Sequence, residues 1–600
     1  METTPAMQHP VSATATASLR ATPTSPGKPK RLATFDTLCE SLDYAAQGDC
    51  GFNFYSARGQ LTAALPYRDL RDQARSLARR LLAADLKRGD RVALLAATSP
   101  EFLSLFFACQ YAGLIPVPMP LPTAFGRREA YVDQIKAQLL SSQARTVLGP
   151  KDFMPLVSEA AQSMQLALVG SHGDIAALPE KGALAPAKAA ELSYIQYSSG
   201  STRFPKGVMV SHANLMANCR GMNSFGIQVR EGDRGLSWLP FFHDMGLVGF
   251  VMCGSTSQTS VDFLATEDFA RRPLTWLKLF SDNGATVTYA PSFGYELCAR
   301  RVSTMSEGAL QLDLSRWRLA GIGGEMIKPK VMRAFADAFK PYGFSDQSFC
   351  ASYGLAECVL AVSFSDNDAG LTLDHVDKNA LEDHRAEPVA ETAPDARTFV
   401  ACGKVLPDHK VEIRAYDGTV VSERVVGRIF FKGPSVMLGY LNDDEATAEA
   451  LQDGWLNTGD LGYWLNGELV IVGRAKDMMI INGRNVWPQD IEWAVEHVEG
   501  LRSGDSAAVL LGAGDEERPA VLVQCRAAKA ADRQRLAAEV KARVQEAAGV
   551  TCEVILVAPR SLPKTSSGKL ARTRAKAMYE RGEIPALPRD SDGAAVADEG

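Results

Sequence analysis

The stretch YIQYSSGSTRFPKGVMV, residues 194–210, decides how the rest of the chain is interpreted. Residues 194–197 predict a buried strand, and a helix is expected from His212 onward. The segment between them is rich in Gly, Ser and Thr and carries two cations, Arg203 and Lys206. Glycine frees the backbone to curl, and hydroxyl, N–H and cationic groups can then face an anion. A phosphate-binding loop is therefore expected. A flexible Ser/Gly turn is the alternative, and the flanking strand and helix count against it.

This loop departs from the Walker A pattern, because Pro205 stands where a glycine should precede Lys206 and no Ser or Thr follows. The residues expected to surround the phosphates are Ser198, Ser199, Gly200, Ser201, Thr202 and Lys206. The pattern thus predicts a phosphate loop of another class.

The length of 600 residues predicts several domains or subdomains, because a single core seldom grows beyond about 250–300 residues. With 46% hydrophobic and 22% charged residues, the composition is that of a globular protein and excludes a mostly disordered chain. Lys and Arg number 64 against 70 Asp and Glu, which gives a formal net charge of −6. A general nucleic-acid-binding protein would carry a basic excess, so no nucleic-acid partner is expected.

The 11 cysteines are scattered and form no C-x-x-C pair, so we expect free thiols in a reducing compartment rather than a zinc or redox site. No run of about 18 apolar residues occurs, so no transmembrane segment is predicted. Residues 1–30 are rich in Thr, Ser, Ala and Pro and lack the apolar core of a secretory signal. We expect a disordered tail there, with a transit peptide as the alternative, and a cytoplasmic protein.

Helices alternating with short buried strands predict an α/β fold with covered sheets. Helices are expected at 67–84 and 101–112, and strands at 91–96 and 113–117. A smaller unit follows, with helices expected at 488–497 and 530–547 and strands at 507–511, 520–524 and 553–557. We therefore predict a large N-terminal domain of several α/β subdomains over 31–475, a small mobile α+β lid domain over 476–580 and a loose acidic tail over 581–600.

Four further motifs follow the loop in order: SYGLAE at 352–357, NTGDLG at 457–462, GRAKDMMIINGR at 473–484 and PKTSSGK at 563–569. Together with the loop they resemble the adenylate-forming superfamily, which comprises acyl-CoA synthetases, luciferases, peptide-synthetase adenylation domains and fatty acyl-AMP ligases. The resemblance covers residues 31–580. It implies an enzyme that uses ATP and Mg²⁺ to join a carboxylate to AMP.

The resemblance also implies where the nucleotide binds. The residues concerned are Ser352, Tyr353, Gly354, Gly323, Gly324, Glu325, Asp460 and Arg474. Tyr353 would offer its ring to adenine, and the Gly-Gly-Glu segment would let the backbone approach the base. Asp460 would accept both ribose hydroxyls, and Arg474 would support the ribose or the phosphate. A core tyrosine, a glycine turn and a Gly-Asp turn are the structural alternatives.

Two of the matched motifs carry the expected catalytic residues. Lys569 would neutralise the charge that builds at the α-phosphate. Glu357 and Thr202 would hold Mg²⁺, for which a carboxylate is a suitable hard ligand. Lys476 lies in the motif that resembles the hinge between the domains. An exposed surface lysine and a carboxylate at a helix start are the alternatives for Lys569 and Glu357.

The segment WLPFFHDMGLVG, residues 238–249, places His243 beside Asp244 and close to Gly246. No H-E-x-x-H or G-x-S-x-G pattern supports a zinc ligand or a hydrolase base here. In the resembled family this histidine borders the acyl carboxylate, so these three residues are expected at the acyl site. Because a fatty carboxylate is already ionised at neutral pH, we expect His243 to contribute to catalysis by positioning the substrate.

Three details resemble fatty acyl-AMP ligases more than acyl-CoA synthetases. They are Arg203 in the loop, the segments PFFHDMGLVG and APSFGYELC (290–298), and the segment 369–398 after SYGLAE. That last segment is polar and poor in aromatic residues, which is typical of a surface excursion rather than a core element. The resemblance implies that it is the insertion that restricts the C-terminal domain of these ligases and suppresses CoA use.

These features predict a two-step enzyme. A fatty acid and ATP would give acyl-AMP and pyrophosphate, and the acyl group would pass to the phosphopantetheine thiol of a holo acyl carrier protein, often of a polyketide or peptide synthase. A fatty acyl-CoA synthetase is the alternative within the class. A non-catalytic acyl- or nucleotide-binding regulator is the alternative from another class, and Lys569, Glu357 and Asp460 argue against it.

Overall fold

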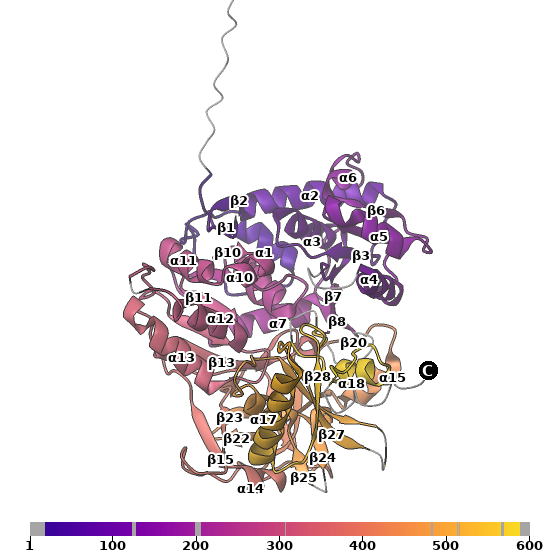
Figure 1. Ribbon diagram of the computed structural model, residues 1–600. Coiled ribbons are helices and arrows are strands. Elements are labelled where there is room, and N and C mark those ends of the chain that lie inside the picture. The colour runs from indigo at the N-terminus through magenta and orange to yellow at the C-terminus, as the bar shows by residue number, and fades with distance from the viewer. Residues whose placement is uncertain are drawn as a thin grey trace, which may run out of the picture.

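The computed structural model describes residues 19–122, 128–198, 206–306, 308–481, 484–512, 514, 517–565 and 569–588. It confirms the predicted fold class: a large domain built from covered α/β sheets lies beside a smaller α+β domain (Figure 1). No helix within these ranges is long and apolar enough to cross a membrane.

A four-stranded parallel sheet lies near the start of the large domain. Its strands, in spatial order, are β4 (Ile115–Met119), β3 (Arg91–Leu95), β5 (Thr146–Gly149) and β6 (Leu168–Ser171). The helices of this region are α1 (Leu38–Ala45), α2 (Tyr67–Ala83), α3 (Pro100–Ala112), α4 (Arg128–Ser142), α5 (Met154–Ala161) and α6 (His172–Ala176). Every residue of α3 from Phe102 to Ala112 is buried, which explains why the sequence of this helix is apolar almost throughout. The strand predicted at 113–117 begins later, at Ile115, because Gly113 caps α3 in the left-handed conformation with φ 67°.

A nine-stranded mixed sheet forms the centre of the large domain. Its strands, in spatial order, are β17 (Lys404–Val405), β14 (Ala361–Phe364), β13 (Phe349–Gly354), β12 (Leu319–Ile322), β11 (Val287–Ala290), β9 (Arg234–Ser237), β10 (Ser260–Leu264), β1 (Gly51–Tyr55) and β2 (Leu61–Pro66). Strands β11, β12 and β13 run parallel. Since the carboxyl ends of parallel strands meet at one edge of a sheet, Gly323 and Ser352 reach the same edge, where ligands bind in such sheets.

The helices and helical turns around this sheet include two π-helical segments. They are α7 (His212–Gly221), the π-segment η2 (Met222–Gly226), α8 (Asp244–Gly246), the π-segment η3 (Leu247–Met252), α9 (Cys253–Thr256), α10 (Thr266–Arg271), α11 (Leu274–Asn283), α12 (Ser292–Val302) and α13 (Pro329–Phe339). The predicted helix from His212 is α7, and its first turn is capped by Ser211.

Two antiparallel sheets complete the large domain. One contains β20 (Gly439–Tyr440), β8 (Gly207–Ser211) and β7 (Leu192–Tyr197), so the predicted phosphate loop joins two hydrogen-bonded strands. The other contains β18 (Lys410–Arg414), β19 (Gly427–Lys432), β22 (Trp455–Leu465), β21 (Leu451–Gln452) and β23 (Glu468–Arg474), with α15 (Asp444–Ala450) beside it. The second sheet carries Asp460 and Arg474 on paired strands.

The expectation that 369–398 is a mere surface excursion is wrong. The segment forms the strand β15 (Leu373–Asp377), the helix α14 (Lys378–Glu382) and the start of the strand β16 (Ala396–Val400), which pairs with β15. We refer to residues 373–400, which comprise these three elements, as the inserted hairpin. Val376 and Leu381 of this segment are buried in one apolar cluster with Phe399, Tyr463 and Trp487, the last of which lies at the beginning of the small domain. The apolar residues that make this contact are few and alternate with polar ones, so composition alone concealed the core contribution.

The expected disorder up to residue 30 is also wrong in part, since residues 19–30 belong to the folded domain. Thr22 is buried, its backbone N–H donates to Asn53 Oδ1 at 2.8 Å, and its hydroxyl lies 2.9 Å from that of Ser260. Residues 1–18 and 589–600, including most of the expected acidic tail, lie outside the described residues.

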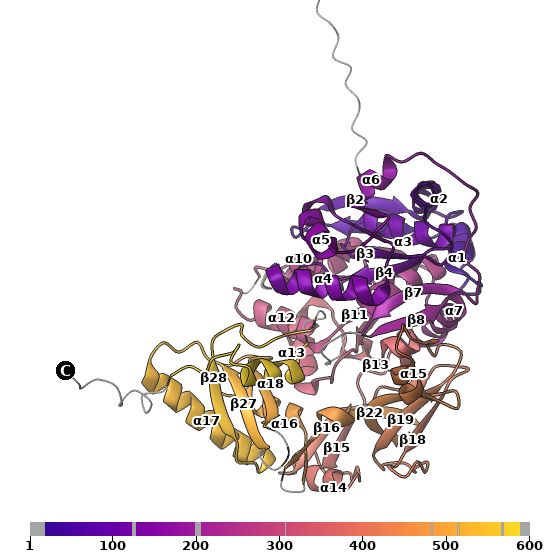
Figure 2. The same ribbon diagram turned by 90° about the vertical axis from the view of Figure 1, so that its right-hand side faces the viewer.

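The small domain contains the predicted helices and strands. Its elements are β24 (Met479–Ile481), β25 (Arg484–Val486), α16 (Pro488–Val495), β26 (Ser506–Leu511), β27 (Arg518–Gln524), α17 (Ala530–Ala548), β28 (Glu553–Val557) and α18 (Arg572–Glu580). It has apolar clusters of its own, one of them including Val521, Val540 and Leu556. Figure 2 shows it beside β15, β16 and α14, at one end of the large domain.

Candidate active site

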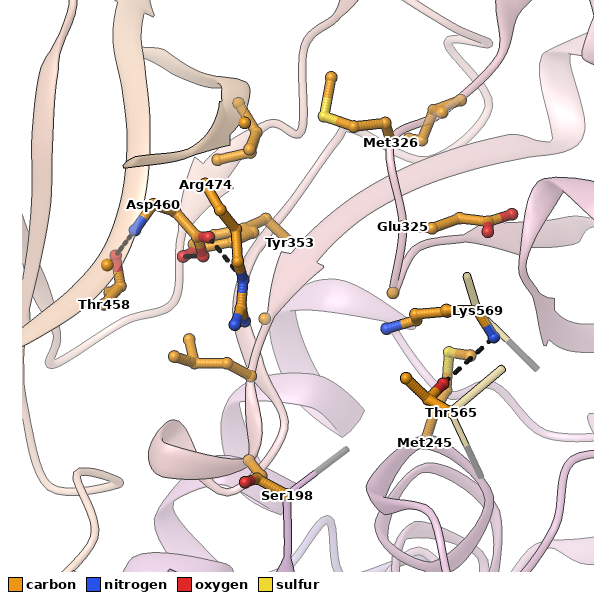
Figure 3. Close-up of a pocket in the computed structure, with 18 of the residues that line it drawn as sticks. Ser198, Met245, Glu325, Met326, Tyr353, Thr458, Asp460, Arg474, Thr565 and Lys569 are labelled. Carbon is orange, nitrogen blue, oxygen red and sulfur yellow. Dashed lines mark hydrogen bonds and ion pairs between the residues drawn. The ribbon is translucent and has the colours of Figure 1, made fainter. Parts of the chain in front are cut away.

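A cavity of about 1060 Å³ lies where the two domains meet. The large domain contributes the edge of the nine-stranded sheet and strands β22 and β23, and the small domain contributes α16 and Lys569. Figure 3 shows Tyr353, Asp460 and Arg474 on one side of the cavity and Glu325 and Lys569 on the other. This volume lies at the upper end of the range of roughly 300–1,000 Å³ usual for ligand pockets. It leaves room for two substrates side by side.

Asp460 is the centre of a compact polar group in the large domain. The Tyr353 hydroxyl donates to its Oδ2 at 2.6 Å, and Arg474 Nε lies 3.2 Å from its Oδ1. Burial raises the pKa of the Asp460 carboxyl, and the charge of Arg474 opposes that rise. The pKa of Arg474 is raised mainly by the charge of Asp460. These contacts fix an anionic acceptor at the edge of the cavity, as the ribose role requires. Each carboxylate oxygen of Asp460 thus has one protein neighbour and can accept a second hydrogen bond from a ligand hydroxyl.

Lys569 enters the same cavity from the small domain. Its loop is closed by two hydrogen bonds with Thr565, one from Thr565 N to Lys569 O at 2.7 Å and one from Lys569 N to Thr565 Oγ1 at 3.2 Å. Burial lowers the pKa of the Lys569 ammonium, while the carboxylates of Asp244 and Glu325 act in the opposite direction. An anionic ligand beside Lys569 would stabilise the charged form of this buried ammonium.

His243 and Asp244 lie on the cavity wall at the start of the short helix α8. His243 Nδ1 is 2.7 Å from Asp244 Oδ1, and the Met245 N–H donates to the same oxygen at 2.7 Å. Burial tends to raise the pKa of Asp244, but His243 and then Lys569 outweigh it, so that this pKa lies below its usual value. Asp244 therefore holds the imidazole ring in place and adds negative charge opposite Lys569.

Glu325 takes a position that sequence reasoning did not describe. Its carboxylate accepts from the Phe293 N–H at 3.4 Å, at the start of α12, and lines the cavity. Burial raises its pKa, and Lys569 opposes this rise. The side chain thus faces the reaction centre, in addition to the backbone role that was expected for this segment.

Glu357 lines the cavity beside Lys206 and Tyr440. The Tyr440 hydroxyl donates to Glu357 Oε1 at 2.9 Å, and the Lys206 ammonium lies 4.7 Å from the centre of the Tyr440 ring. Among the described residues, no hydrogen bond to Glu357 Oε2 is found, so this oxygen can face a hard cation. No cluster of three or more metal-binding side chains occurs in the described part of the chain. A single carboxylate is the usual protein contribution to Mg²⁺ held by substrate phosphates, so the residues fit this ion.

The predicted glycines differ in what they do. A Cβ at Gly323 would lie 2.8 Å from Ser352 Oγ, and one at Gly354 would lie 1.8 Å from Leu360 O, so both positions require close approach of neighbouring backbone or side chains. Gly324 lines the cavity with φ +80°. Gly246 packs against the Pro240 carbonyl, which would be 2.3 Å from its Cβ. Gly246 is absent from the cavity lining among the described residues, so its acyl-site role stays a prediction.

Of the predicted phosphate loop, Ser198 and Lys206 line the cavity. Ser199, Gly200, Ser201 and Thr202 lie outside the described residues, and their expected contacts with phosphate and Mg²⁺ stay predictions. Lys476 lines the cavity in the helical turn Ala475–Asp477, directly after Arg474. This is where the chain passes from the large domain to the small one.

Ion pairs join the two domains around the cavity. Lys328 Nζ lies 2.7 Å from Glu496 Oε2 and donates to Ser503 Oγ at 2.7 Å. On the side of the inserted hairpin, Arg484 forms a forked pair with Glu382, with the shorter bond 2.7 Å from Arg484 Nη2 to Glu382 Oε1. The small domain is thus held in the arrangement that brings Lys569 into the cavity.

A second pair on the hairpin side joins Arg397 of β16 to Asp490 of α16 at 3.0 Å. Arg397 is buried, and its ring neighbours are Phe399 and Trp487. Burial lowers the pKa of this guanidinium. The inserted segment therefore contributes both charge and apolar surface to the domain interface.

Sequence reasoning missed Tyr440, Lys328 and Arg572. Arg572, three residues after Lys569, contacts Asp477 at 3.2 Å and Glu492 at 2.7 Å, and so links the Lys569 loop to the turn after Lys476 and to α16. Its short distance from Lys569 along the chain was a usable signal. Tyr440 and Lys328 acquire their roles from residues 83 and 168 positions away, which no local pattern indicates.

Comparison with known proteins agrees with this geometry. The family model described as AMP-binding enzyme matches residues 49–441. A putative acyl-CoA synthetase of Caulobacter vibrioides is 49% identical over 571 residues, which cover 94% of this chain and 99% of that protein. The medium-chain-fatty-acid–[acyl-carrier-protein] ligase JamA of Moorena producens is 31% identical over 579 residues, covering 92% and 96% of the two chains.

A solved structure is also similar to this chain over most of its length. A chain from structural and functional studies of fatty acyl-adenylate ligases from E. coli and L. pneumophila is 47% identical in sequence, with a TM-score of 0.88. The similarity covers 92% of this chain and 100% of that chain. It therefore extends beyond the residues that the family model matches and into the small domain.

Proposed function

Because the chain belongs to the family of AMP-binding enzymes, we propose that it activates a fatty acid with ATP and passes the acyl group to the thiol of a holo acyl carrier protein. One observation carries the proposal. Lys569 of the small domain, Asp460 of the large domain and His243 beside an apolar recess line one cavity. That arrangement suits the joining of two anions, a nucleotide and a carboxylate.

In the first step, a carboxylate oxygen of the fatty acid attacks the α-phosphorus of ATP. A new oxygen–phosphorus bond forms, the bond from the α-phosphorus to the bridging oxygen breaks, and its electron pair leaves with pyrophosphate. Lys569 stabilises the negative charge that grows at the α-phosphate, and Asp460 with Tyr353 positions the nucleoside. His243, held by Asp244, orients the attacking carboxylate. No proton transfer is needed, since the acid is already ionised.

Mg²⁺, when bound, would neutralise phosphate charge and orient the leaving group. We assign Glu357 to this ion, with Thr202 as the second ligand expected from the sequence. Tyr440 fixes the Glu357 carboxylate by its hydrogen bond and leaves Oε2 for the cation. Lys206 adds a further positive charge near the same phosphates.

In the second step, the phosphopantetheine thiolate attacks the acyl carbon, a thioester forms and AMP leaves. We propose that the turn at Lys476 serves as the hinge and that Lys569 moves away between the steps. The turn Ala475–Asp477 joins the last strand of the large domain to the small domain, as a hinge must. The free, buried cysteines support a reducing, cytoplasmic location for this reaction.

A fatty acyl-CoA synthetase is the second candidate, and the Caulobacter vibrioides relative favours it by its description. The similarity to the acyl-carrier-protein ligase JamA supports the carrier-protein reaction. The inserted hairpin contacts Asp490 and Arg484, and these contacts stabilise the arrangement in which Lys569 occupies the cavity and acyl-AMP forms. The same contacts oppose the withdrawal of Lys569 that precedes transfer to either acceptor, so weakening them should raise transfer.

The experiment that decides is a mass-spectrometric panel of fatty acids with ATP and Mg²⁺, with no acceptor, CoA or a holo carrier protein. We expect acyl-AMP and pyrophosphate without acceptor, and acyl carrier protein in preference to acyl-CoA when acceptors are offered. Efficient acyl-CoA formation by the unmodified protein would establish the second candidate. The absence of pyrophosphate with every acid would support the non-catalytic alternative.

A further inference from the structure

Part of the wall of the cavity that His243 lines is apolar. It is lined by Met222, Ile227, Gly249, Tyr289, Leu360 and Phe364. These residues come from η2 and the residue after it, from η3, from β11 and from β14 and the residue before it. A wall of this composition takes a hydrocarbon group rather than a polar one.

Two π-helical segments, η2 (Met222–Gly226) and η3 (Leu247–Met252), supply one side of this recess. A π-segment carries more residues per turn than an α-helix and is frequent at functional sites. Gly249 lies in η3, and a Cβ there would lie 3.4 Å from Leu360 Cδ2, an ordinary contact. Because Gly249 has no side chain, the recess is wider beside this residue, and a larger residue at position 249 would fill that space.

The strand register gives the depth of the recess. Tyr289 of β11 lies opposite Gly321 of β12, two residues before Gly323 at the reaction edge of the sheet. At roughly 3.3 Å per strand residue, the Tyr289 backbone lies about 7 Å below that edge. The Tyr289 ring covers Gly321, since a Cβ there would be 2.3 Å from the ring atoms. This ring therefore forms a floor on the sheet face.

The floor is held on several sides. The rings of Tyr289 and Phe364 meet edge to face, with centroids 6.0 Å apart and planes at 89°. A Cβ at Gly226 would lie 2.7 Å from the Phe364 ring, so the π-segment presses on the far side of that ring. The Tyr289 hydroxyl donates to Cys350 Sγ at 3.5 Å. It is therefore already engaged and does not offer a hydrogen bond to a ligand in the recess. Both rings are buried in the core.

The proposed function places the alkyl tail of the fatty acid in this recess, and we propose that the Tyr289–Phe364 pair sets the longest unbranched chain that fits. The proposal rests on the proposed function, since it places the carboxylate beside His243. A tail that reaches the rings gains the burial of each methylene, and a longer tail meets two packed aromatic rings. An acid with a hydroxyl at its far end would bury that hydroxyl without a partner in the described lining, and it is disfavoured.

The test is an adenylation profile over straight-chain acids from hexanoate to octadecanoate, measured as kcat/KM by pyrophosphate release. Tyr289→Leu and Phe364→Leu remove one ring each and should move the optimum to longer acids. Each methylene newly buried should contribute about fourfold in kcat/KM. Gly249→Val should move the optimum to shorter acids, because it narrows the recess above the floor.

Two matched variants separate chain-length control from general loss of stability. Tyr289→Phe keeps the ring and removes only the hydroxyl, so its profile should equal that of the wild type. Phe335→Leu removes a buried ring that packs on Trp317, away from the cavity, and should lower the melting temperature without moving the optimum.

The outcomes are distinct. Folded Tyr289→Leu and Phe364→Leu proteins with an unchanged chain-length optimum would overturn the proposal and leave the proposed function intact. A wild-type preference for acids that end in a hydroxyphenyl ring would overturn the alkyl assignment. Absence of adenylation with every acid would overturn both the proposed function and this inference.

Discussion

The two halves of the active site are built in opposite ways. In the large domain, Asp460 is fixed by Tyr353 and Arg474 through contacts of 2.6 and 3.2 Å between residues of the strands β13, β22 and β23. In the small domain, Lys569 lies at the end of a loop where Thr565 and Lys569 form two hydrogen bonds with each other. It lies in the cavity because ion pairs such as Lys328–Glu496 hold the two domains together. The Asp460 group, which we propose binds the nucleotide, is formed within the large domain, whereas the position of Lys569, the proposed catalytic cation, depends on how the domains are arranged. Affinity for the nucleotide and the rate of its reaction can therefore be changed separately.

The strongest test of this contrast is Lys569→Ala. It should lower kcat for acyl-AMP formation by about 10²–10³-fold, because it removes a charge that acts mainly on the transition state. The KM for ATP should change little, since the Asp460 group is untouched. Pyrophosphate release and the melting temperature are the measurements. Lys576→Ala, in α18 of the same domain, is the control because its ammonium bonds to the Gly512 carbonyl. Normal turnover in a folded Lys569→Ala protein would remove this residue from catalysis.

Asp460→Ala addresses the other half and should raise the KM for ATP. A hydrogen bond to a charged acceptor contributes about 1.5–3 kcal/mol, and Asp460 offers such bonds to the ribose. The fatty acid KM should stay near that of the wild type. Isothermal titration with ATP measures the effect, and Asp366→Ala, an exposed residue paired with Lys404, is the control. An unchanged ATP affinity would place the ribose elsewhere.

Lys476→Pro tests whether the arrangement of the domains, rather than either half, limits the second step. Proline fixes φ and removes an N–H, which opposes the change of backbone dihedrals that a hinge must make. Transfer to the carrier protein should fall further than acyl-AMP formation. Single-turnover assays of each half-reaction measure the ratio. Equal loss in both would indicate misfolding or a hinge at another position.

The smallest expected effect comes from Glu382→Ala, which breaks the forked pair with Arg484. Pairs at this exposure contribute about 0.2–1 kcal/mol, so acyl-CoA formation should rise by no more than about fivefold, with adenylation unchanged. The double variant with Arg484→Ala should add nothing further. A point variant is preferable to deleting 369–398, because deletion would remove β15 and expose the cluster around Val376. If acyl-CoA formation does not change in either variant, this pair has no part in selecting the acceptor.

Much of the fold was predictable because its signals are local. Buried parallel strands such as RVALL at β3 are continuously apolar, and α2 repeats its apolar residues at helical spacing. The inserted hairpin was misjudged because Val376 and Phe399 become core residues only through contact with Tyr463 and Trp487, far along the chain. Thr22 was misjudged for the same reason, since its partners are Asn53 and Ser260.

The site was predictable where the motif carries the residue itself. Asp460, Tyr353 and Lys569 meet in one cavity as expected. The supporting residues were not predictable, because their roles depend on distance in space. Tyr440 matters only because it reaches Glu357, and Lys328 matters only because Glu496 of the small domain lies beside it. Glu325 faces the cavity because the start of α12 offers its carboxylate a backbone N–H.

Lys569 is supplied by the small domain. Under the proposed withdrawal of that domain between the two steps, this placement has a consequence for reversibility. A group that lowers a barrier lowers it equally for the forward and the backward reaction. When the small domain withdraws, attack of pyrophosphate on acyl-AMP loses the same ammonium that assisted its formation. The mixed anhydride is then kinetically protected from return to ATP while it remains beside His243. In this proposal, the placement of a single lysine on the small domain favours onward transfer of the acyl group over return to ATP, without changing the equilibrium of the first step.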